Sequence, residues 1–126
     1  MSLPRARILR TSRQFTRVRA EGTPCIGRFL LLTAIPSTEP ESVSLFGFIT
    51  PRYVGKAHDR NRVRRRLKAI AAVLAGSIPS GFHVVTLARR TVGQADFATL
   101  EKEWRRLATK AGLIEKEKRP SKGDSA

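Results

Sequence analysis

One stretch of the chain, residues 47–75, constrains the fold more than any other. At about 100° per residue, the apolar residues of its second half fall within a narrow arc, as expected for an amphipathic helix. These residues are Val63, Leu67, Ile70 and Leu74. Between Arg60 and Lys68, six of nine residues are Lys or Arg and none is acidic. Such a helix must pack on an apolar layer with one side and expose concentrated positive charge on the other.

The apolar layer that this helix needs is predicted from four other segments. The apolar runs 28–35, 42–50 and 82–88 are short and rich in bulky residues, which is typical of buried strands. Residues 23–26 are expected to add a short edge strand, which Pro24 weakens because proline donates no backbone hydrogen bond. We therefore expect a sheet of three or four strands.

Two further helices are predicted, one on each side of this core in the sequence. Ser12 is expected to cap the first helix and Asp96 the last. The order is then helix, two or three strands, helix, strand, helix. This predicts one domain of mixed α/β or α+β class, with helices packed against one sheet.

The two ends of the chain are predicted to be less ordered than this core. We expect residues 1–10 to be loosely held, apart from Leu9 just before the first helix. The single domain should span residues 1–114. Residues 115–126 are charged and nearly free of apolar side chains, so we expect a disordered tail.

The charge of the chain predicts a polyanionic partner. The net charge is +15, from 25 Lys and Arg residues against 10 Asp and Glu. The basic residues divide into 18 Arg and 7 Lys, and the planar guanidinium group suits phosphate better than an ammonium group does. Cys25 is the only cysteine, and no apolar run approaches the length of a membrane span. We expect a cytoplasmic protein with no membrane partner.

The arginine-rich helix is interpreted as a surface for RNA phosphates. Arginines spaced around one helical face can meet several phosphates at once, and each neutralised phosphate releases counterions. Asn61 among them could bond RNA or fix an arginine. A solvated charged face is the plainer alternative, but the absence of acids removes the usual ion pairs between successive turns.

Protein-borne catalysis and metal binding are not predicted. His58 and Asp59 have no third ligand at a metal-binding spacing, and the acidic residues form no defensible catalytic pair. We expect no catalytic residue, no metal site, no small-molecule substrate and no cofactor in the protein itself.

Taken together, these segments resemble the bacterial ribonuclease P protein component. The resemblance covers roughly residues 9–113 and is based first on Arg60-Asn61-Arg62, which is similar to the RNR signature of that family. The strand with Gly47-Phe48-Ile49 and the loop Val54-Gly55-Lys56-Ala57 precede the triplet at the expected spacing. Ala88-Arg89-Arg90 is similar to the family's strand end after the central helix.

The resemblance implies a fold and an activity. The fold is an αβββαβα sandwich around a central sheet, with a left-handed βαβ crossover (the ribosomal protein S5 domain 2-like arrangement). The activity is endonucleolytic removal of the 5′ leader of precursor tRNA, which matures the tRNA 5′ end. Catalysis is carried by an RNA subunit with Mg2+ in its active site, and the protein is its non-catalytic subunit. Ribonuclease P RNA and precursor tRNA are the implied partners.

The resemblance also implies two sets of contact residues. Those expected to bind the RNA subunit are Arg52, Lys56, Arg60, Asn61, Arg62, Arg64, Arg65 and Lys68. Those expected to line a cleft for the leader are Phe15, Val18, Leu32, Phe48, Arg89 and Arg90. Family members often have aromatic residues at the positions matched here by Leu32 and Arg19.

Charge alone leaves other functions open. A structural RNA-binding protein, such as a small ribosomal protein, is the main alternative, and a protein-only nuclease is a third. Apolar cleft residues beside a basic helix favour the ribonuclease P interpretation, because a purely structural binder needs no groove for a mobile single strand.

Overall fold

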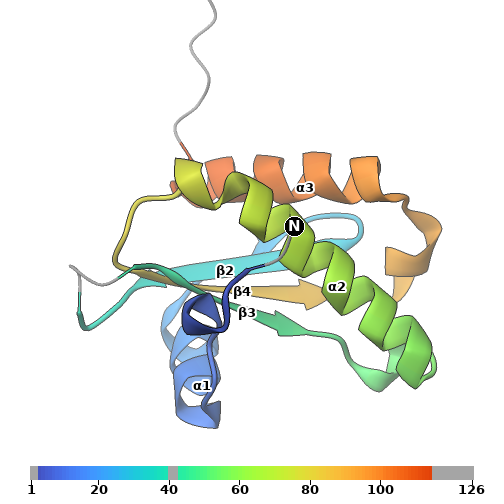
Figure 1. Cartoon of the computed structure of the whole chain (residues 1–126), viewed down its shortest axis with the longest axis horizontal. Helices are drawn as coiled ribbons and strands as arrows, with labels where there is room; N and C mark the ends of the chain where they lie inside the picture. Colours follow the sequence, from blue (N-terminus) through green and yellow to red (C-terminus); the bar gives the residue numbers. More distant parts are fainter. Residues whose placement is uncertain (1–2, 40–42, 115–126) are drawn as a thin grey trace, which may run out of the picture.

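The computed structural model describes residues 3–39 and 43–114, and their elements follow the predicted order (Figure 1). The helices and strands are α1 (Ser12–Glu21), β1 (Cys25–Ile26), β2 (Leu30–Pro36), β3 (Leu45–Ile49), α2 (Ala57–Leu74), β4 (Phe82–Ala88) and α3 (Phe97–Lys110). Four short 3-10 helices join them: η1 (Arg5–Arg7), η2 (Arg52–Val54), η3 (Ala75–Ser77) and η4 (Arg90–Gln94). The αβββαβα order is confirmed, and the predicted tail lies outside the described residues. None of the helices in the described part of the chain is long and apolar enough to span a membrane.

The sheet has the strand order β1-β2-β4-β3. Its centre is the antiparallel pair of β2 and β4, which runs from Leu30 opposite Ala88 to Pro36 opposite Phe82. β3 pairs in parallel with β4, and α2 connects these two neighbours. The predicted βαβ crossover is therefore present, and its left-handed sense stays an implication of the family resemblance.

Helices cover both faces of the sheet, with α2 and α3 on one face and α1 on the other (Figure 1). The larger core lies under α2 and α3 and includes Leu32, Phe46 and Val84 from the strands. Trp104 of α3 is fully buried there, and its indole Nε1 donates to Thr86 Oγ1 at 2.8 Å. The Trp104 donor is thus satisfied inside the core.

The smaller core fixes α1 on the opposite face. It is formed by Val18, Leu9, Ile35 and Val85, with Phe15 partly buried against them. Gly22 follows the last residue of the helix, and the N-cap is Thr11 rather than the predicted Ser12. Thr11 Oγ1 accepts from the Gln14 amide, and Gln14 Oε1 accepts from the Thr11 amide. This reciprocal capping box satisfies two backbone donors at the start of the helix.

The N-terminal segment, residues 3–10, wraps around the edge of the sheet at β3. Leu3 is buried in the larger core and Leu9 in the smaller one, so the segment contacts both faces. Between them Ile8 forms a parallel bridge with Phe46, whose carbonyl accepts from the Leu9 amide at 2.9 Å. The expectation of a loosely held segment is wrong for residues 3–8, whereas the anchoring of Leu9 is confirmed, because the two leucines are spaced to reach both cores.

Glu103 in α3 is buried, although sequence reasoning gave it no role. Its carboxylate accepts from three consecutive backbone amides, those of Arg28 at 3.0 Å and of Phe29 and Leu30 at 2.7 Å each. Gly27 passes so close that an added Cβ would lie 2.5 Å from the Glu103 carboxyl carbon. The carboxylate therefore fixes the connection between β1 and β2 to α3.

Candidate RNA-binding surfaces

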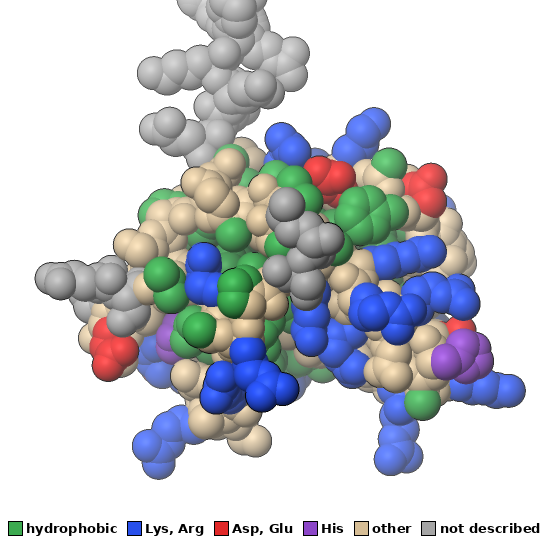
Figure 2. Space-filling view, in the orientation of Figure 1, with side chains coloured by type: hydrophobic (Ala, Val, Ile, Leu, Met, Phe, Trp, Pro, Cys, Tyr) green, Lys and Arg blue, Asp and Glu red, His purple; other side chains and the backbone are tan. Residues whose placement is uncertain are grey.

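The solvent side of α2 carries most of the residues predicted to bind the RNA subunit. We define this basic face as Arg60, Asn61, Arg62, Arg64, Arg65 and Lys68. Val63, Leu67 and Ile70 on the other side are buried, so the two-sided helix predicted from the sequence is confirmed. Figure 2 shows Lys and Arg side chains over α2 and beside it, with few acidic side chains between them.

Two arginines of the basic face are held by the protein itself. Arg60 Nη1 donates to the carbonyl of Gly55 at 2.9 Å. Arg64 donates to Asn61 Oδ1 at 2.9 Å and to Thr50 Oγ1, just after β3, at 2.6 Å. Of the two roles considered for Asn61, the structure thus shows that of positioning an arginine. These contacts attach Arg64 to the end of β3 and Arg60 to the loop before α2.

Arg62 and Arg65 differ from these two because they are exposed and unpaired. Neither guanidinium group has a hydrogen bond or ion pair with any residue in the described ranges. Both lie on the side of α2 away from the buried stripe. Their full donor set is available to a phosphate or a base edge.

The loop before α2 adds two exposed cations and one helix cap. Arg52 and Lys56 are exposed, and the Lys56 amide donates to Asp59 Oδ2 at 3.1 Å. Asp59 therefore caps the first turn of α2, where a negative charge also complements the helix dipole. The capping fixes where the basic face begins.

Arg89 and Arg90 lie at the end of β4, close to this loop. Arg89 Nη1 donates to the Gly27 carbonyl at 2.7 Å. The Arg90 guanidinium lies 5.1 Å from the centre of the Tyr53 ring, and Tyr53 Oη donates to the Ala88 carbonyl at 3.4 Å. Arg89 and Arg90 thus add positive charge at one end of the sheet. The basic face of α2 extends to the same end.

A cleft of about 230 Å³ lies between α1 and the sheet. Its walls are mostly apolar and include the half-buried side chains of Leu31, Ile49 and Leu87. The other lining residues are Arg19, Pro24, Thr33 and Val85. Ile49 directly precedes Thr50, the partner of Arg64, so the cleft and the basic face meet at the end of β3.

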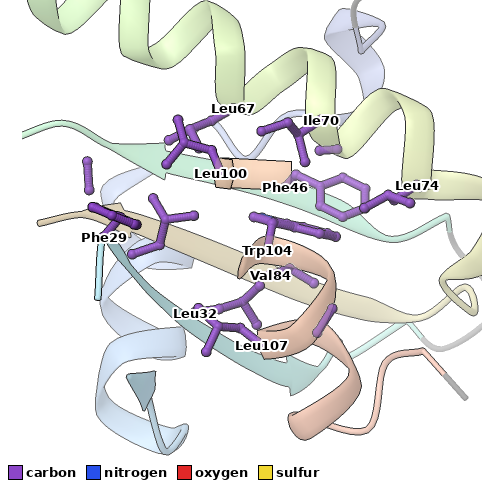
Figure 3. Close-up of a cluster of buried hydrophobic side chains, with 14 of the residues drawn as sticks. Phe29, Leu32, Phe46, Leu67, Ile70, Leu74, Val84, Leu100, Trp104 and Leu107 are labelled. Carbon is purple, nitrogen blue, oxygen red and sulfur yellow. The ribbon is translucent and has the colours of Figure 1, made fainter. Parts of the chain in front are cut away.

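The structure places two of the residues predicted to line this cleft on the other face of the sheet. Leu32 is 0% exposed and packs with Leu107, Val84 and Trp104 on the far face of the sheet (Figure 3). Phe48 also packs against that larger core. Successive residues of a strand point to opposite faces, so Leu31 and Thr33 flanking Leu32 occupy the cleft face instead.

Val18 and Phe15 are on the correct face but support the cleft rather than line it. Val18 is fully buried and fixes α1 on the sheet. The Phe15 ring lies over Gly47, where an added Cβ would be 2.5 Å from the ring atom Cε1. Gly47 is needed because any side chain there would displace Phe15 from the sheet.

The two histidines lie in α2 and β4. No group of three or more His, Cys, Asp or Glu side chains within residues 3–39 and 43–114 could hold a metal ion. His58 is exposed beside Asp59, with Nε2 and Oδ1 3.3 Å apart. Burial of His83 and the nearby Arg17 guanidinium lower the pKa of His83 below its usual range. Neither histidine lines the cleft, and His58 lies in the first turn of α2, two residues before Arg60.

Comparisons with known proteins identify the same family that the sequence motifs suggested. The family model described as Ribonuclease P matches residues 3–112. The ribonuclease P protein component of Syntrophomonas wolfei is 35% identical over 106 residues, 84% of this chain and 87% of the relative. That of Chloroflexus aggregans is 37% identical over 111 residues, 87% of this chain and 81% of the relative.

Solved structures agree with the fold. The ribonuclease P protein of Thermotoga maritima superposes with a TM-score of 0.72 at 26% identity, covering 86% of this chain and 99% of that one. The Staphylococcus aureus protein gives a TM-score of 0.78 at 14% identity, covering 88% and 100%. At that low identity the second likeness concerns the fold alone.

Proposed function

The chain belongs to the ribonuclease P protein family, and from this premise we propose how it acts as the protein subunit of a tRNA-processing ribonucleoprotein. The basic face of α2, with Arg52 and Lys56, contacts the RNA subunit. The cleft beneath α1 receives the single-stranded 5′ leader of precursor tRNA. Removal of that leader matures the tRNA 5′ end. The protein acts in the cytoplasm, where both RNA partners are made in bacteria.

The charge distribution supports contact between the basic face and RNA. Exposed arginines without protein partners can each neutralise a phosphate, and the counterions released favour binding. Arg60 and Arg64 are already oriented by the protein, so little side-chain entropy is lost when they meet RNA. The RNA subunit supplies the catalytic groups, with Mg2+ assisting the hydrolysis. The protein brings two polyanions together by lowering their mutual repulsion.

The shape and polarity of the cleft support leader binding. Leu31, Ile49 and Leu87 offer apolar contact to bases, and Arg19 can pair with a backbone phosphate. Thr33 and Leu31 replace Leu32 as the β2 residues of this cleft, and neither is aromatic. We therefore propose that leader recognition here depends on apolar contact and charge more than on base stacking.

One observation carries the proposal: the basic face and the apolar cleft lie on opposite faces of the sheet but meet at Ile49 and Thr50. A protein bound to the RNA subunit through α2 thus presents the cleft next to that contact. The test is cleavage of precursor tRNA by a ribonuclease P RNA at low Mg2+, with and without the protein. Strong stimulation is expected. No stimulation, together with ribosomal RNA co-purifying in stoichiometric amount, would support a structural ribosomal role instead.

Replacing Leu31 and Leu87 by Ala should weaken binding of precursor tRNA that carries a leader while sparing mature tRNA. Each side chain is half-buried, so the lost apolar contact amounts to about 1 kcal/mol and the pair to a roughly 10-fold to 30-fold affinity loss. Affinities are measured with the assembled ribonucleoprotein for both RNAs. Val73→Ala, an exposed apolar residue on α2, is the control. Equal losses for precursor and mature tRNA would argue against a leader cleft.

A further inference from the structure

A second cavity, of about 500 Å³, lies between the N-terminal segment and α2. Its lining residues are Leu3, Arg5, Ile8, Arg10 and Lys68. We call this cavity the N-terminal groove. Of these residues only Lys68 belongs to the basic face, so the groove brings two arginines of a distant part of the sequence to α2.

The backbone of the N-terminal segment is fixed without using the charges that line the groove. Leu3 and Leu9 anchor it in the two cores, and Arg7 Nε donates to the Ser44 carbonyl at 2.9 Å. The Arg7 guanidinium also lies 5.6 Å from the centre of the Phe46 ring. Arg7 thus serves to attach the segment, whereas Arg5 and Arg10 on either side of it are exposed.

The positive charge of the groove is uncompensated. No Asp or Glu is among its lining residues. Within the described ranges, the side chains of Arg5, Arg10 and Lys68 make no hydrogen bond or ion pair. The electrostatic potentials of like charges around a concave surface with apolar parts add up. The groove should therefore attract anions more strongly than the same cations would on a flat surface.

The groove also continues a row of cations along α2. Arg60, Arg64 and Lys68 are spaced four residues apart and therefore lie one above another on the helix. Arg60 and Arg64 are the two arginines that the protein positions, and Lys68 is the point where the row enters the groove. A polyanion that follows this row would pass from α2 onto Arg5 and Arg10.

We propose that the N-terminal groove binds the phosphodiester backbone of a single-stranded or junction segment of the RNA subunit. The groove has cations on both walls, Arg5 and Arg10 on one and Lys68 on the other, so they can contact a single RNA backbone from two sides. A duplex fits less well, because its phosphates lie on a convex surface. Leu3 and Ile8 also line the groove and can make apolar contact with a sugar or a base edge. The inference rests on the proposed function and adds Arg5 and Arg10 as contact residues. Continuity with the basic face favours the RNA subunit over the leader, whose cleft lies across the sheet.

The test compares two double variants of the full-length chain, each losing two positive charges. Arg5→Ala with Arg10→Ala alters the groove, and Lys102→Ala with Lys110→Ala alters exposed positions on α3. Binding to ribonuclease P RNA is measured over a series of KCl concentrations. The groove variant should lose roughly 10-fold in affinity near 0.15 M salt, and its salt slope should fall by about 1.5, or about 0.7 to 0.9 per phosphate contact. The α3 variant should keep the wild-type slope.

Three outcomes would overturn the proposal. The groove variant could bind like wild type, or both variants could lose affinity equally through general charge. The groove variant could instead bind the RNA subunit normally and lose affinity only for leader-bearing precursor, which would assign the groove to substrate. Thermal unfolding of the variants checks that folding is retained. Failure of the proposed function is separate, because it would appear as absent stimulation by the wild-type protein.

Discussion

Replacing Glu103 by Ala is expected to lower the free energy of unfolding by about 3 to 5 kcal/mol, because buried amides lose their acceptor. The Phe29 and Leu30 amides are shielded from water, so an alanine at position 103 leaves them without any partner. Leaving a buried donor unsatisfied costs roughly 1 to 3 kcal/mol each, and here the lost acceptor is also charged. Since small domains are stable by about 5 to 15 kcal/mol, this single change should approach the limit of folding.

Urea denaturation of the full chain measures this effect, with Glu101→Ala as the matched control. Glu101 lies in the same helix, and its one ion pair among the described residues is with Arg105, 3.5 Å away at the surface, so its loss should cost less than about 1 kcal/mol. The Glu103→Gln variant should have an intermediate free energy of unfolding. The carbonyl oxygen of the glutamine can accept a hydrogen bond, but its NH2 group would face backbone donors that it cannot pair with. Equal midpoints for Glu103→Ala and Glu101→Ala would contradict the role assigned to the buried carboxylate.

The burial of Glu103 could in principle have been predicted from the sequence. At helical spacing Glu103 falls between Leu100 and Leu107, on the apolar side of α3. A charged residue in that position must be paired or hydrogen-bonded when buried. What the sequence does not contain is the partner, since the three amides come from a connection more than 70 residues away. Tertiary contacts of this kind follow from the fold and not from local pattern.

The misassigned cleft residue has a different cause. Leu30, Leu31 and Leu32 are identical in type, so this part of β2 has no alternation between polar and apolar residues that would show which side chain faces α1. A shift of one residue moves every side chain to the other face of a sheet. In α2, by contrast, the charged and apolar residues differ at every turn, and the predicted orientation of the helix was confirmed. Sequence pattern therefore located the basic face better than the cleft.

Replacing Arg62 and Arg65 together by Ala should reduce affinity for ribonuclease P RNA roughly 10-fold to 100-fold near 0.15 M salt, with the salt slope lowered by about 1.5. Both side chains are exposed and lack partners among the described residues, so their loss removes the proposed RNA contacts and no described protein contact. The free energy of unfolding should stay constant or rise, because the chain carries a net charge of +15 and two repelling charges are removed.

Arg64→Ala is expected to behave differently from this pair, which separates binding from stability. Arg64 donates to Asn61 and Thr50, so its removal should lower the free energy of unfolding by about 1 kcal/mol as well as weaken RNA binding. The Arg62→Lys and Arg65→Lys double variant keeps both charges and loses the planar guanidinium fork. It should retain the salt slope of wild type with an intermediate affinity, since Lys binds phosphate as a point charge. If the alanine pair instead lost stability while its RNA affinity stayed unchanged, the unpaired arginines of α2 would have to be assigned to folding, and the contact with the RNA subunit would have to lie on Arg60, Arg64 and the groove beside them.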